Sequence, residues 1–132
     1  MSAYSDRVSI RSATLAVALV VLVSACGLIE RPQPAQWIPL WEDAKAILPD
    51  LTVGEPSEAE CSAALVLLRE AAPALRPTPD DSIDETVDRW LLIAEETMFE
   101  CPADTGDLTT FDAAYLELDR LADQVDVVVY DS

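Results

Sequence analysis

The chain has 132 residues, of which 25 are acidic, 8 are basic and none is histidine, so its formal net charge at pH 7 is −17. This charge excludes DNA and RNA as partners, because their phosphates would be repelled. The length allows one small domain with a single modest core. Without histidine, the chain lacks the commonest general base and the commonest metal ligand. We therefore expect no catalytic residue, no cofactor and no metal site.

Residues 1–25 have the layout of a secretory signal. A short polar segment with two arginines comes first, residues 13–23 are almost entirely apolar, and two small residues follow. The apolar segment is too short for an ordinary membrane span, which needs ~20 residues. A basic start, a short apolar core and small residues at the cleavage point are typical of a signal peptide that is removed on secretion.

The tetrapeptide Val23-Ser24-Ala25-Cys26 at the end of this segment resembles the lipobox of bacterial lipoprotein precursors. The resemblance covers the leader alone and implies nothing about the fold. It implies that Cys26 carries a diacylglycerol and becomes the new N-terminus, which anchors the protein on the extracytoplasmic face of the membrane. In a host with two membranes, Gly27 would favour the outer one. The alternative is an uncleaved anchor over residues 13–29, a stretch of the shortest length that can span.

The segment after the lipidated cysteine contains several prolines. We expect residues 26–39 to be an extended tether and residues 40–132 to be the folded domain. Four apolar residues near this boundary indicate the start of the fold, with a short helix over 40–48; they are Trp37, Ile38, Leu40 and Trp41. The alternative use of the tryptophans is contact with the membrane interface.

Three longer helices follow. The first is expected over 57–72, because Ser57 and Glu60 form a capping box. Its apolar face holds Cys61, Ala64, Leu65, Leu68 and Ala72. The second is expected over 82–100, with a capping box at Ser82 and Glu85. Its apolar face holds Ile83, Val87, Trp90, Leu91, Ala94, Met98 and Cys101.

The third longer helix is expected to begin at Thr109 or Thr110. Its apolar face holds Phe111, Ala114, Tyr115, Leu118, Leu121, Ala122 and Val125. The last seven residues are rich in valine and have no partner strand, so we expect an extended or frayed tail. The sequence thus predicts an all-α bundle of one short and three longer helices with an extended C-terminal tail.

Two cysteines remain if Cys26 is acylated. In a secreted protein this even number favours a disulfide between Cys61 and Cys101. Both lie at the same end of an expected antiparallel helix pair, so the geometry also favours this bridge. The alternatives are two free thiols or an intermolecular bridge.

Acidic residues supply the remaining candidate sites. Asp80, Asp81, Asp84 and Glu85 could bind a divalent cation such as calcium, but capping of the next helix explains them equally. Asp104-Thr105-Gly106 spells the motif of aspartic proteases, but it stands alone in a helical chain, so we interpret it as coincidence. Glu95, Glu96 and Glu100 are the strongest basis for an enzyme that uses carboxylates alone.

Three hypotheses for the function follow from these features. The favoured one is a membrane-anchored, non-enzymatic interaction or modulator protein of the cell envelope, whose partner is another envelope or membrane protein. The second is a lipoprotein that binds a small ligand or a divalent cation. The third is the carboxylate-only enzyme.

Overall fold

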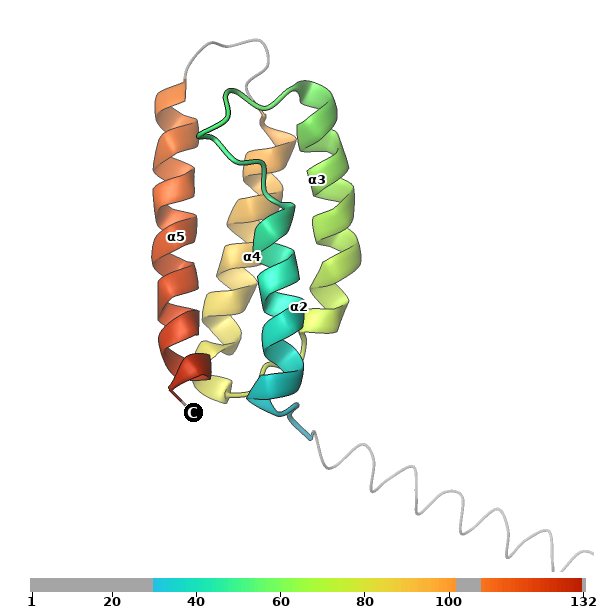
Figure 1. Ribbon diagram of the computed structural model, residues 1–132, viewed down its shortest axis with the longest axis vertical. Helices are drawn as coiled ribbons and strands as arrows, with labels where there is room; N and C mark the ends of the chain where they lie inside the picture. The colour runs from blue at the N-terminus through green and yellow to red at the C-terminus, as the bar shows by residue number, and fades with distance from the viewer. Residues whose placement is uncertain (1–29, 102–107, 132) are drawn as a thin grey trace, which may run out of the picture. The chain divides into compact units, whose positions relative to one another are not determined.

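The computed structural model describes residues 30–101 and 108–131. Arg31–Ser132 forms one compact unit. Its α-helices are α2 (Pro34–Ile47), α3 (Glu58–Ala71), α4 (Asp84–Phe99) and α5 (Leu108–Tyr130). Successive helices run in opposite directions, and α5 returns to lie beside α2 (Figure 1). Two short 3₁₀ helices, η1 (Ala72–Leu75) and η2 (Asp81–Ile83), connect α3 to α4. The predicted all-α bundle is confirmed.

The first helix of the bundle is longer than the sequence predicts. It begins at Pro34, so residues 34–39 of the predicted tether are helical. Pro34 lies in the first turn, where a helix needs no amide donor. Trp37, Trp41 and Ala44 follow at helical spacing and are all buried. Packing of this face outweighs the backbone hydrogen bond that Pro39 cannot donate, and it places both indoles in the core.

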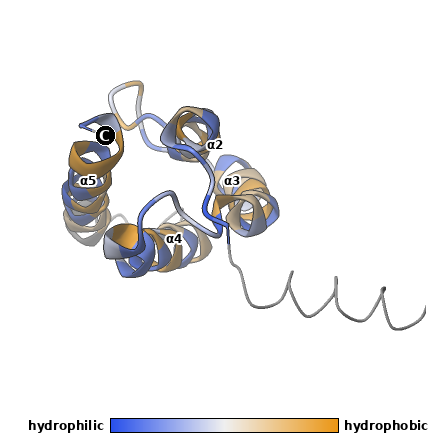
Figure 2. Cartoon of the chain, turned by 90° about the horizontal axis from the view of Figure 1, so that it is seen from below, coloured by the Kyte–Doolittle hydropathy of each residue, from blue (hydrophilic) through white to orange (hydrophobic). Residues whose placement is uncertain are grey.

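The core is built around three indole rings. Trp37 and Trp41 stack with their ring centroids 5.6 Å apart. Trp41 and Trp90 of α4 pack in a T-shaped arrangement with their centroids 4.9 Å apart. The indole N–H of Trp37 donates a hydrogen bond of 3.0 Å to the carbonyl of Leu75 in η1. The helices turn apolar faces toward this interior (Figure 2). The predicted faces of α3, α4 and α5 are buried or half-buried along their whole length.

The C-terminal segment is helical, so the predicted extended tail is wrong. Helix α5 continues to Tyr130, two residues before the end of the chain. Val125 and Val129 are four residues apart, share one face and are buried in the core. Burial of this face outweighs the preference of consecutive valines for extended backbone, because helix propensity is a weak determinant beside tertiary packing.

The predicted disulfide is present. Cys61 lies in the first turn of α3 and Cys101 follows the end of α4, and their Cα atoms are 6.1 Å apart. The start of α3 and the end of α4 meet at the end of the bundle away from the start of α2 (Figure 1). The disulfide therefore joins an antiparallel helix pair at its open end.

Candidate functional site

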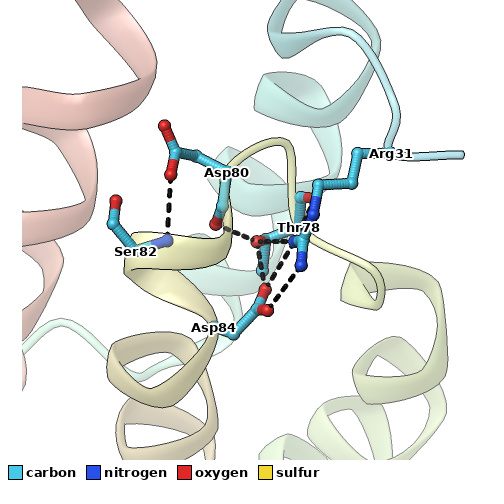
Figure 3. Close-up of polar contacts among 5 residues, drawn as sticks. All are labelled: Arg31, Thr78, Asp80, Ser82 and Asp84. Atoms are coloured by element: carbon cyan, nitrogen blue, oxygen red, sulfur yellow. Dashed lines mark hydrogen bonds and ion pairs between the residues drawn. The ribbon is translucent and has the colours of Figure 1, made fainter. Parts of the chain in front are cut away.

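The most connected polar cluster lies where the chain enters the bundle. Arg31, three residues before α2, reaches across to the start of α4 (Figure 3). Its two terminal nitrogens donate hydrogen bonds of 2.9 Å each to the two oxygens of the Asp84 carboxylate. The same guanidinium donates to the backbone carbonyl of Thr78 at 3.1 Å and to its hydroxyl at 3.3 Å. Arg31 thus holds the incoming chain to the loop before α4. We call Arg31, Thr78 and Asp84 the entry clasp.

The proline-rich loop between η1 and η2 positions the entry clasp. Thr78 stands between two prolines and its side chain is buried. The Thr78 hydroxyl lies 2.7 Å from the carbonyl of Asp80, and it also hydrogen-bonds to the carboxylate of Asp84. The Asp80 carboxylate accepts the amide of Ser82 at 2.9 Å and so caps η2. The predicted capping box at Ser82 is therefore wrong, because an extra 3₁₀ turn precedes α4 and is capped by Asp80.

The electrostatics of the entry clasp favour an ionised Asp84. Its hydrogen bonds with Arg31 lower the pKa of the carboxyl, and the Thr78 hydroxyl acts in the same direction. Asp84 is also the first residue of α4, where the helix dipole stabilises a negative charge. The cluster needs no metal to neutralise this carboxylate, since the guanidinium already does so.

The acidic residues considered for cation binding have separate structural roles. Asp84 pairs with Arg31, and Asp80 caps η2. Asp81 and Glu85 are exposed in the first turns of η2 and α4. In the part of the chain that the structure describes, no three acidic or cysteine side chains converge as a metal site would require. Capping and pairing account for Asp80 and Asp84.

The glutamates considered for a carboxylate-only enzyme are Glu95 and Glu96 of α4 and Glu100, which follows the end of α4. Glu96 and Glu100 are exposed. Glu95 is half-buried and lines a shallow hollow of about 250 Å³ that also holds Arg69 and Arg76. General acid–base chemistry by carboxylates uses two such groups with different pKa values facing one substrate. The hollow that Glu95 lines is shared with two arginines.

The structure brings Cys61 and Cys101 together. Cys26 and the Asp104-Thr105-Gly106 motif lie outside the described residues. In the part of the chain that the structure describes, no helix is both long enough and apolar enough to cross a membrane. Sequence reasoning did not single out Arg31 or Thr78, and their only sequence signal is their position beside prolines.

Comparison with protein-family models, with curated proteins and with solved structures finds no match for this chain. The arrangement around Arg31 can fix the point at which the chain leaves the bundle, because its guanidinium holds the Asp84 carboxylate and the Thr78 carbonyl together.

Proposed function

We propose that this chain is a bacterial lipoprotein, anchored through Cys26 on the extracytoplasmic face of a membrane, whose domain binds another envelope protein without catalysing a reaction. The observation that carries the anchor is the sequence Val23-Ser24-Ala25-Cys26 directly after a short apolar segment. The non-enzymatic role is supported by the lack of histidine and by the engagement of Asp84 in the entry clasp.

The entry clasp would hold the domain close to such an anchor. Arg31 follows Cys26 by five residues, which span at most about 17 Å when fully extended. Because Arg31 is bound to Asp84 and Thr78, the chain leaves the bundle at a fixed point. The end of the bundle with the entry clasp would therefore stay near the headgroups, and the end with the disulfide would face the envelope space.

Two further properties support an extracytoplasmic interaction protein. The Cys61–Cys101 disulfide is the type of bond that persists in an oxidising compartment. The excess of acidic side chains would be repelled by anionic lipid headgroups. A surface of this charge remains available to a partner with a basic patch and speeds its association.

The anchor can be tested by the mass of the protein purified from membranes. We expect a product that begins at Cys26 and carries the mass of added acyl chains, while Cys26→Ala leaves the precursor uncleaved and unmodified. A membrane-bound product that retains Met1 would contradict the proposed anchor.

The interaction role can be tested by crosslinking in living cells. We expect one envelope protein to be crosslinked to the anchored protein and to be lost with Cys26→Ala. A domain that crosslinks to no protein while anchored at its normal level would contradict this role.

A further inference from the structure

A groove of about 440 Å³ lies at the end of the bundle away from the entry clasp. It is formed between the loop after α2 and the N-terminal half of α5, which approach each other in this region (Figure 1). The Tyr115 hydroxyl donates a hydrogen bond of 3.0 Å to the carbonyl of Pro49 and so joins the loop to the helix. The groove volume falls in the ~300–1,000 Å³ range of ligand-binding pockets.

The lining of the groove combines apolar surface with negative charge. It consists of Pro49, Asp50, Leu51, Thr52, Asp112, Tyr115, Leu116 and Asp119. Leu116 is 71% exposed, although it is a leucine in the middle of a helix. Three of the lining residues are aspartates and none is basic. Among the described residues, Asp112 and Asp119 form no ion pair, so their charge remains available to a partner.

The electrostatics of Tyr115 are consistent with a negative groove. Burial raises the pKa of its phenol to about 12, and the charges of Asp119 and Asp50 act in the same direction. The phenol therefore stays protonated and keeps its hydrogen bond to Pro49 at any physiological pH. This hydrogen bond holds the loop after α2 in place as one side of the groove. The negative charge of the groove comes from its aspartates.

The spacing of the charges indicates what kind of group would fit. Asp112 and Asp119 are seven residues apart, which is about 10.5 Å along a helix. A single small cation could not contact both carboxylates at that distance. Leu116 lies between them along α5, so a matching surface would present an apolar side chain between two basic ones. A protein segment can supply this pattern of side chains. Because the groove lies at the end of the bundle away from the proposed anchor, an envelope protein could bind there without contacting the membrane surface.

We propose that this groove docks a segment of an envelope protein in which an apolar side chain is flanked by two basic side chains. The segment places its apolar side chain over Leu116 and its basic groups beside Asp112 and Asp119. This inference rests on the proposed function, since it requires an anchored protein with an envelope partner.

The test uses site-specific photo-crosslinking of the full-length, anchored protein in living cells. The probe is p-benzoylphenylalanine in place of Leu116. The matched control places the same probe at Leu92, which is 56% exposed on the outer side of α4. We expect a protein adduct from position 116 whose attachment site in the partner carries basic side chains on both sides of an apolar one. We expect little or no adduct from position 92.

The charge requirement is tested in the same experiment. Asp112→Asn together with Asp119→Asn should lower the adduct from position 116 by about fivefold, because two exposed charge pairs are lost. Asp43→Asn together with Asp123→Asn removes two exposed charges outside the groove and should leave the adduct unchanged. All these side chains are exposed, and circular dichroism of each variant checks that the bundle is folded.

The outcomes separate this inference from the proposed function. Adducts from position 92 but not from position 116 would overturn the groove and leave the interaction role standing. An adduct from 116 that is insensitive to the two aspartates, or whose attachment site is acidic, would also overturn the groove. No protein adduct from either position would overturn the groove, and crosslinking of the whole anchored protein, described above, then decides the interaction role separately.

Discussion

Trp41 on α2 donates its indole N–H to the carboxylate of Asp126 on α5 at a distance of 2.8 Å, across 85 residues of sequence. The same carboxylate lies 3.3 Å from the ammonium group of Lys45, which also pairs with Glu42 at 2.8 Å. Glu42 in turn accepts the hydroxyl of Tyr130 at 2.7 Å. These contacts join the first and last helices of the bundle and place a charged partner beside a fully buried tryptophan.

Asp126→Ala should destabilise the protein by about 1–3 kcal/mol, because the buried N–H of Trp41 loses its acceptor. Trp41 is 0% exposed, so its N–H has no contact with water in the folded wild-type protein. The control is Asp123→Ala, an exposed aspartate on the same helix, which should change the free energy of unfolding by less than about 0.5 kcal/mol. Urea unfolding measures both, and equal effects would contradict the role of Asp126.

The helical C-terminus can be tested with two neighbouring valines. Val129 is 2% exposed and Val127 is 62% exposed. Two residues that are two positions apart lie on opposite sides of a helix, so this difference is expected there. In an extended strand both side chains would point to the same face. Val129→Ala should cost about 1.5–3 kcal/mol from lost burial and the cavity left behind. Val127→Ala should be neutral or slightly stabilising, because alanine is the better helix former.

Urea unfolding of the two variants again provides the measurement. Similar losses of stability for Val127→Ala and Val129→Ala would indicate an extended tail packed against the bundle. A loss confined to Val129→Ala supports the helix.

The sequence patterns that repeat over several turns predicted the fold correctly. The buried faces of α3, α4 and α5 follow the expected apolar spacing, and Ser57 caps α3 by accepting the amide of Glu60 at 3.1 Å. The predictions were wrong where the decisive contact is distant in sequence. Nothing near Pro34 shows that Trp37 will donate its indole N–H to Leu75, 38 residues away. Nothing near Val129 shows that Asp126 will accept the indole N–H of Trp41, 85 residues away.

The polar sites also differ in whether the sequence could predict them. Cys61 and Cys101 were predicted as a pair because parity and helix ends are visible in the sequence. The entry clasp was not predicted, because it joins Arg31 to a residue 53 positions away. The groove was missed for a related reason, since residues 49–52 meet α5 only after the bundle has formed.

The disulfide should contribute about 4 kcal/mol to stability through the loop of 40 residues that it closes in the unfolded chain. Reductant should therefore lower the urea midpoint of the wild-type protein substantially. The double variant Cys61→Ala with Cys101→Ala should be destabilised without reductant and should not respond to it. A wild-type protein whose midpoint is the same with and without reductant would contradict a stabilising disulfide.

The entry clasp should make stability depend on pH in the acidic range. The pKa of Asp84 in the folded state is lowered by Arg31, below the ~3.9 of an unperturbed aspartate. The folded state therefore binds fewer protons, and the clasp is fully stabilising above the unfolded pKa. This stabilisation is lost as the pH falls from about 4 through the lower folded pKa.

Asp84→Asn should consequently cost about 1 kcal/mol at pH 7, as expected for a partly exposed bidentate pair. The difference between wild type and variant should shrink as the pH is lowered below about 4, because the carboxyl of unfolded wild-type protein is protonated first. The folded carboxyl is protonated at still lower pH and is then uncharged, like the asparagine amide. Arg31→Gln should show the same pH dependence, and the double variant should lose little more than either single one.

Asp43→Asn, at an exposed aspartate with no ion pair among the described residues, should leave the acid unfolding profile unchanged. Urea unfolding at a series of pH values between 2 and 7 measures these differences, and a cost of Asp84→Asn that stays constant down to pH 2 would show that Asp84 acts through packing instead of charge.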